Sequence, residues 1–392
     1  MRWVIVCEVP LDPKNGAGMR AILPYLSFLP PHSLTSLYLS GQKHYGMGRK
    51  GVNYVEVPCS NQPGFRVISV FFGTLYKIFR NLQGQNHFII IPNTIRDVLM
   101  GLACRLTSRN TTVWVMDDFI ETYAWKGRVF KKFCSLLFGV LYRTARQRIA
   151  VSESMGDYYL QIYGKESNYI LGRTLKEIPQ LRLRSHPQLH PQLQSKGSNK
   201  VFAGKEKLKL VYVGSFIPHY LGPVRIIKQI LEKNALDIKL DLYGMHPPST
   251  DWLLPDKITY RGSIPDEDLL PTLSLYDYGL IPYSFTTETS RMMGLSFPSK
   301  LIDYLGASLP ALIIAPEGLS FLKTAKSKNI GAICSGFSSL SEDSIARAIQ
   351  QSIHDISEVE ATTYESWQRN AHEWAKESFL CDKEKIKQIL GY

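Results

Sequence analysis

The sequence is poor in cysteine and has no closely spaced cysteine pair. Its 392 residues include only six, which are Cys7, Cys59, Cys104, Cys134, Cys334 and Cys381. None forms a CxxC pair, the spacing typical of zinc sites and redox-active dithiols. The scatter is also unlike the disulfide framework of a small secreted domain. We therefore expect reduced thiols, no metal site and a cytoplasmic protein.

Long apolar runs are also missing. A membrane-spanning helix needs about 18 apolar residues, and the longest candidate, Phe133 to Tyr142, is far shorter. Glu8 and Pro10 interrupt the apolar N-terminal stretch, which favours a first β-strand over a signal peptide. We expect no membrane span, so any contact with the inner face of the cell membrane would be peripheral.

Acidic residues are fewer than basic ones, 34 against 46, for a net charge of +12. This balance favours anionic partners such as nucleotides, nucleic acid or an anionic membrane. The basic residues are spread out with no recognisable nucleic-acid-binding module, so we expect no nucleic acid partner. Segments 65–80 and 128–148 combine apolar faces with Arg and Lys. They are either core helices with basic rims or helices that lie on anionic lipid.

Short Val- and Ile-rich runs alternate with helical patterns in both halves of the chain. We expect two doubly wound, Rossmann-like α/β domains at 1–180 and 207–363, with ligands bound in the cleft between them. A Pro-rich linker spans 181–206, and a helical tail spans 364–392. The linker contains His186 and His190, whose neighbouring prolines deny them a helix, so we interpret them as linker residues. Strands are expected at 3–9, 34–39, 52–57, 87–91, 112–116, 148–152, 208–214, 238–244, 257–262, 278–283 and 311–315, and a helix is expected over 266–276.

The stretch LSFPSKLIDYLGASLPAL has a lysine where helix electrostatics do not favour one. Pro298 is expected to begin a helix whose one face carries Leu301, Leu305 and Ser308. Lys300 then lies in the first turn, at the positive end of the helix dipole. An anion held there would explain the cation, and Asp303 shares the face of Lys300. Ser299 and Lys300 are candidate diphosphate ligands and Asp303 a candidate sugar-hydroxyl acceptor, unless the two form an ordinary surface pair.

Two glycine-containing turns are further candidate phosphate sites. Gly214 and Ser215 follow a buried strand and precede a helix, with His219 and Arg225 as phosphate partners. Gly16 and Gly18 form a similar turn after the first strand. Both turns lack the GxGxxG and GxxxxGK[ST] patterns, so an ordinary strand-to-helix turn remains the alternative.

Two adjacent carboxylates follow the strand that ends at Met116. Asp117 and Asp118 are expected at the carboxyl end of the sheet, where a carboxylate can accept a proton from a substrate hydroxyl. Neighbouring residues on an extended chain point in opposite directions, so at most one would be catalytic. The alternative is a pair of turn-forming aspartates.

The C-terminal half resembles the GT-B glycosyltransferases, particularly the broad family 4 (group 1) type. LVYVGSF, ITYRGSIPDEDLLPTLSLYDYGLIPY, GLSFPSKLIDYLGASLPALI and the helical tail carry the match in that order. The third segment is similar to the family pattern PxKLxEYLAxGxPV, with Asp303 for Glu and Ser308 for Gly. In the N-terminal half the resemblance rests on NGAGMR, MDDF and RIAVSESMGDYYLQIYG.

The resemblance implies a nucleotide-diphosphate sugar, UDP- or GDP-linked, as donor, with no cofactor and no metal. Ser299 and Lys300 would bind the diphosphate, Asp303 the ribose, and Gly262 and Ile264 the base. Glu288 would meet a sugar hydroxyl, and the tail would cross back to the N-terminal domain.

The chain departs from the family pattern at two places. Leu295 stands where many members carry a first glutamate, and Ser215 and Phe216 stand near a usual arginine. Inversion would use Asp117 or Asp118 as general base, whereas in a retaining reaction the leaving phosphate would take the proton.

The expected function is sugar transfer to a glycan or lipid-linked hydroxyl in cell-surface polysaccharide or glycolipid synthesis. A nucleotide-sugar epimerase of the same fold and a non-catalytic sugar-nucleotide-binding or scaffold protein are the alternatives.

Overall fold

The structure, a computed structural model, forms two compact units. Unit 1 comprises Met1–Thr174, Leu295–Phe297 and Cys381–Tyr392, and unit 2 comprises Leu175–Gly294 and Pro298–Leu380. The predicted linker, with His186 and His190, lies outside the described residues from position 185 onward. Residues are described over 2–12, 17–42, 51–60, 62–82, 84–120, 127–184, 207–216, 218–233, 237–283, 285, 293–336 and 341–391.

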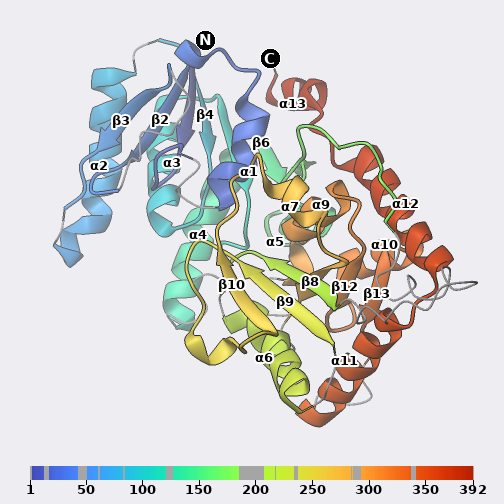
Figure 1. The fold of residues 1–392 in the computed structure, drawn as a ribbon. Helices are drawn as coiled ribbons and strands as arrows, with labels where there is room; N and C mark the ends of the chain where they lie inside the picture. Colours follow the sequence, from blue (N-terminus) through green and yellow to red (C-terminus); the bar gives the residue numbers. More distant parts are fainter. Residues whose placement is uncertain are drawn as a thin grey trace, which may run out of the picture. The chain divides into compact units, whose positions relative to one another are not determined.

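Unit 1 is built on a seven-stranded parallel sheet in the order β3-β2-β1-β4-β5-β6-β7 (Figure 1). The reversal of strand order at β1 and β4 makes it doubly wound. The β4 and β5 strands are buried along their whole length, as expected for a parallel sheet covered on both faces. The strands are β1 Arg2–Val6, β2 Leu34–Leu39, β3 Asn53–Val57, β4 Asn86–Ile90, β5 Thr111–Val115, β6 Gln147–Ala150 and β7 Asn168–Tyr169.

Helices α1 to α5 connect these strands, and α3 packs against both α2 and α4. A capping box begins α3: the Thr94 side chain accepts from the backbone of Asp97, whose carboxylate accepts from the backbone of Thr94. Ser152 caps α5 at its start, and Gly164 ends it in the left-handed conformation. The helices are α1 Ala17–Leu26, α2 Pro63–Asn81, α3 Ile95–Thr107, α4 Arg128–Thr144, α5 Glu153–Tyr163 and α13 Lys383–Leu390, with a 3-10 turn, η2, at Pro31–Ser33.

Unit 2 has a six-stranded parallel sheet in the order β10-β9-β8-β11-β12-β13 (Figure 1). Its strands are β8 Leu208–Val213, β9 Ile238–Tyr243, β10 Ile258–Gly262, β11 Tyr278–Pro282, β12 Ala311–Ile314 and β13 Gly331–Cys334. Its helices are α6 Pro218–Lys233, α7 Leu269–Leu273, α9 Ser299–Gly306, α10 Ser320–Lys328, α11 Glu342–Ser357 and α12 Ala361–Ser378, with a 3-10 turn, η5, at Thr250–Trp252.

The predicted fold class, two doubly wound parallel α/β units, is confirmed, while several local predictions are wrong. The helix expected over 266–276 shortens to α7, and the tail is two helices, α12 and α13, rather than one. Pro298 is the N-cap residue and α9 begins at Ser299. Ser308 is not on the helical face, because α9 ends at Gly306 and Ser308 has a φ of 55°. Strands β7 and β13 were not expected, because two- and four-residue strands carry almost no periodic signal.

Candidate functional site

The side chain of Lys300 lies across the end of strand β8. A Cβ atom on Gly214, the residue after that strand, would stand 2.2 Å from Cε of Lys300. Gly214 also has a φ of 150°, which a residue with a side chain rarely adopts. The glycine is therefore needed for the lysine to occupy this place, and the structure brings two predicted site residues into direct contact.

The surroundings of Lys300 disfavour its charged form. Desolvation lowers the pKa of its amine to about 8, and the neighbouring Asp303 carboxylate acts in the opposite direction. The amine is 5.2 Å from the ring centre of Tyr212, within the range of a cation–π interaction. A bound anion would favour the charged amine, so the site is electrostatically suited to a phosphate.

Tyr304 holds α9 against the strand that carries Gly214. Its buried hydroxyl accepts a hydrogen bond from the backbone N–H of Val213 at 3.1 Å and lies 3.2 Å from the Leu280 carbonyl oxygen. The ring fits because a Cβ on Gly279 would come within 2.3 Å of it. Lys300 and the end of β8 are thus parts of one packed arrangement.

The other predicted residues on α9 have different exposure. Asp303 is buried, three residues after Lys300 and on the same face of the helix. Ser299, the first helical residue, is exposed. Its backbone N–H belongs to the unsatisfied first turn of the helix, where anions are stabilised.

The loops after β8, β9 and β10 are connected through glycines. The N–H of Gly244 donates to the Gly262 carbonyl at 2.9 Å, and a Cβ on Gly244 would lie 2.5 Å from the Gly214 oxygen. The Tyr260 hydroxyl donates to the Gly244 carbonyl at 2.8 Å. Gly244 therefore links the predicted base-contacting residue Gly262 to the Gly214 loop. The half-buried Ile264 follows Gly262 by two residues.

Ser215 and Arg225 make contacts that the sequence did not indicate. The carbonyl of the exposed Ser215 accepts a 2.7 Å hydrogen bond from the Tyr212 hydroxyl. Arg225 is the eighth residue of α6, and its guanidinium lies 5.9 Å from the ring centre of Trp252. This contact gives Arg225 a packing role, and its phosphate role stays a prediction.

Four predicted residues receive no side-chain description. Gly16 and Glu288 lie outside the described residues, as does the side chain of His219 in the first turn of α6. Gly18 is placed only as a residue of α1. Their predicted roles stay predictions.

The two adjacent aspartates of unit 1 have opposite environments. Asp118 is fully buried, and its Oδ1 accepts from the Ile120 N–H and the Tyr159 hydroxyl, both at 3.1 Å. Asp117 is exposed to solvent, although dense surrounding protein raises the pKa of its carboxyl, with a smaller contribution from Asp118. Asp118 is thus placed as a core carboxylate, and only Asp117 is open to a substrate.

Sequence reasoning missed a charged cluster at the carboxyl ends of β1 and β4. Glu8 forms an ion pair with Arg96 and accepts a 2.7 Å hydrogen bond from the Thr94 hydroxyl. Asp97 accepts from the backbone N–H groups of Asn93 and Thr94, and burial raises its pKa to about 7. The capping pattern Thr-x-x-Asp before an apolar helix is the signal that predicts part of this cluster.

The described residues contain neither a metal cluster nor a membrane-spanning helix. No three His, Cys, Asp or Glu side chains gather there into a candidate metal site. No helix of the described segments is long and apolar enough to cross a membrane.

Comparisons with known proteins show what the fold resembles. Residues 219–378 match the family described as glucosyltransferase 3-like, C-terminal domain. HepE of Anabaena, solved with UDP and glucose, is similar with a TM-score of 0.66 and 12% identity, over 100% of this chain and 98% of that one. Sucrose-phosphate synthase of Thermosynechococcus elongatus is similar with a TM-score of 0.62 and 13% identity, over 100% of this chain and 98% of that one. WaaG, a glycosyltransferase of lipopolysaccharide biosynthesis, is similar with a TM-score of 0.62 and 12% identity over the whole of both chains. No curated protein matches in sequence.

These likenesses confirm the GT-B fold predicted from the resemblance. The matched domain also supports glycosyltransferase as the class of protein. The match falls on unit 2 and includes α9 with Lys300 and Asp303, together with the segment from α6 to α12.

Proposed function

We propose that this protein, a glycosyltransferase by fold and by its matched domain, transfers a hexose from a nucleoside-diphosphate sugar to an acceptor hydroxyl. The acceptor is a glycan or a lipid-linked glycan of cell-surface polysaccharide or glycolipid synthesis. The single observation that carries the proposal is the Lys300 side chain, held over Gly214 at the start of α9.

The donor is bound through its diphosphate in this account. The Lys300 ammonium and the first backbone N–H groups of α9 offset the phosphate charge, and Asp303 accepts hydrogen bonds from the ribose. The same groups stabilise the charge that develops on the leaving diphosphate as the sugar bond breaks. Because this chain supplies its own cation there, we infer a metal-independent reaction, to be tested by unchanged turnover in EDTA.

The acceptor side is assigned to Asp117. Its exposed carboxylate can orient the acceptor hydroxyl, and the raised pKa of this carboxyl makes it a stronger base than an ordinary aspartate. In an inverting reaction Asp117 removes the hydroxyl proton. In a retaining reaction the leaving phosphate takes that proton and Asp117 only positions the acceptor.

UDP-glucose is the donor to test first. The matched family is named for a glucosyltransferase, and the similar HepE was solved with UDP and glucose. GDP-glucose is the matched competitor, because it changes only the base.

The test is release of nucleoside diphosphate from each donor with a glycolipid extract as acceptor. We expect release that depends on the extract and places labelled sugar in the lipid fraction. Asp117→Asn should lower kcat with little change in donor binding, whereas Lys300→Ala should abolish donor binding. If the nucleoside diphosphate is released equally without the extract and an altered free sugar forms, the epimerase is supported instead. Donor binding without any turnover would support the scaffold.

A further inference from the structure

Helix α2 exposes an apolar stripe on the side opposite its packed face. Phe65, Ile68, Phe72, Tyr76 and Phe79 are each at least half exposed, and their spacing of three or four residues places them on one face. Buried Val70, Thr74 and Ile78 form the other face. The helix is therefore apolar toward the core and also toward solvent, which a helix that only covers a sheet does not need.

Helix α4 repeats the arrangement. Val129, Phe133, Leu136 and Val140 are exposed at helical spacing, with Val129 reaching 85%. Its buried face is a separate set that includes Phe138 and Leu141. Two neighbouring surface helices with such stripes exceed the scattered apolar exposure that is normal on a protein surface.

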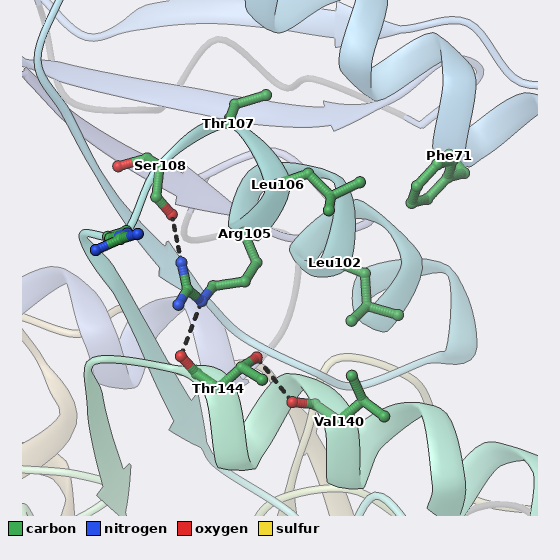
Figure 2. A pocket seen from close by; sticks show the side chains of 9 residues that line it. Phe71, Leu102, Arg105, Leu106, Thr107, Ser108, Val140 and Thr144 are labelled. Carbon is green, nitrogen blue, oxygen red and sulfur yellow. Dashed lines mark hydrogen bonds between the residues drawn. The ribbon is translucent and has the colours of Figure 1, made fainter.

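A groove over α3 connects the two stripes. It has a volume of about 720 Å³ and lies between α2 and α4, both of which pack against α3. Figure 2 shows Leu102 and Leu106 of α3 pointing toward Phe71 of α2 and Val140 of α4. The groove meets the α4 stripe at Val140 and the α2 stripe through Phe71, whose ring centre is 5.5 Å from that of Phe72. The exposed apolar residues of α2 and α4 and the apolar lining of this groove are here called the α2–α4 face.

Charge selects the partner for the α2–α4 face. Helix α2 carries three basic residues and α4 carries four, and neither contains an Asp or Glu. Exposed Arg80, Arg128, Lys132 and Arg143 flank the apolar residues. Arg105 at the groove is held by hydrogen bonds to the Thr144 and Ser108 carbonyls, and Arg109 is exposed at its rim. An apolar surface on two helices that carry basic and no acidic side chains is complementary to a bilayer with anionic head groups.

We propose that the α2–α4 face docks this protein on an anionic lipid bilayer. The aromatic and aliphatic side chains enter the boundary between head groups and acyl chains, and the flanking cations contact the head groups. Docking is peripheral and needs no nucleotide-sugar or acceptor, so it stands or falls separately from the proposed function.

The test is flotation of the full chain with phosphatidylcholine vesicles, with and without phosphatidylglycerol, at low and at high salt. We expect binding to the anionic vesicles only, weakened by salt. The variant Phe72→Ser/Phe79→Ser should lose binding, and Lys132→Glu should lower it about fivefold or more, which is about 1 kcal/mol.

Matched controls separate the α2–α4 face from general surface effects. Leu275→Ser removes an exposed apolar side chain of unit 2, and Lys376→Glu reverses an exposed charge on α12, so both should bind like the wild type. Absence of wild-type binding at low salt, or equal binding of the Phe72→Ser/Phe79→Ser variant, would overturn the proposal. A wild-type dimer that does not bind vesicles, and that becomes a monomer in the Phe72→Ser/Phe79→Ser variant by sedimentation velocity, would also overturn it. The face would then bind a second copy of the chain.

Discussion

At the scale of single residues, the relation between Gly214 and Lys300 is the most informative. The sequence indicates a glycine that admits a phosphate, whereas the structure fills its missing side-chain space with the aliphatic stem of Lys300. The lysine amine is thereby placed at the strand end, where burial lowers its pKa to about 8. This contact joins residues 86 positions apart, so no local pattern in the sequence predicts it.

Gly214→Ala tests this contact. The new methyl group would collide with Cε of Lys300, so we expect nucleotide affinity to fall at least tenfold. Gly164→Ala is the matched control, because Gly164 also has a positive φ, 64°, but has no neighbouring atom within 4 Å of an added Cβ. Isothermal titration calorimetry with UDP should show a loss for Gly214→Ala only. Equal affinities of both variants would contradict the arrangement.

The pH dependence of binding tests the charge of Lys300. Its pKa in the free protein is lowered to about 8, and a diphosphate raises it, so binding takes up a proton above that pH. We expect UDP affinity to be nearly constant from pH 7 to about 8 and then to fall by up to about tenfold per pH unit. Lys300→Arg, which stays charged at these pH values, should remove the fall. A wild-type profile that is flat to pH 10 would refute the lowered pKa.

At the scale of elements, the residues that follow the end of a helix can fix how it contacts its neighbour, as they do after α9. Helix α9 ends at Gly306, and Ser308 follows it at a φ of 55°, at the position where the resembling family has glycine. Its hydroxyl lies 3.0 Å from Nδ1 of His372 on α12, so this serine connects two helices that a glycine would not.

Ser308 therefore predicts an ordering of stability between two variants. Ser308→Ala keeps the left-handed strain and loses the hydrogen bond, whereas Ser308→Gly loses the bond but relieves the strain. We expect the free energy of unfolding of Ser308→Gly to exceed that of Ser308→Ala by about 1 kcal/mol. Urea unfolding of both variants measures the difference, and the reverse order would show that the strain is negligible.

The elements also show what the sequence was able to predict. Strand 34–39 was predicted with its observed bounds although it contains Thr35 and Ser36, because Leu, Thr and Tyr dominate this short run and favour a half-buried or buried strand. The single tail helix was wrong because Phe379 and Leu380 are apolar and continue the helical pattern, although the chain leaves the helix there. The sequence predicted that Asp117 and Asp118 point in opposite directions, but not which of them is buried, because Tyr159, which donates to Asp118, is 41 residues away.

At the scale of the whole molecule, the two units carry different parts of the proposed chemistry. Unit 2 holds the donor candidates around Lys300, and unit 1 holds Asp117 and the α2–α4 face. The predicted cleft between the domains stays a prediction. The resemblance found in the sequence was strongest in unit 2, and so is the match to a known domain, which covers 219–378.

The most direct test of the central claim is a thermal-shift titration with UDP, GDP, ADP and CMP, run on the wild type and on Lys300→Ala. A ligand present at 100 times its Kd stabilises the native state by about 2.7 kcal/mol, which raises the Tm by several degrees. We predict that UDP or GDP stabilises the wild type and that Lys300→Ala loses this shift. If no nucleoside diphosphate shifts the wild type, or if Lys300→Ala shifts equally, Lys300 does not form a donor site.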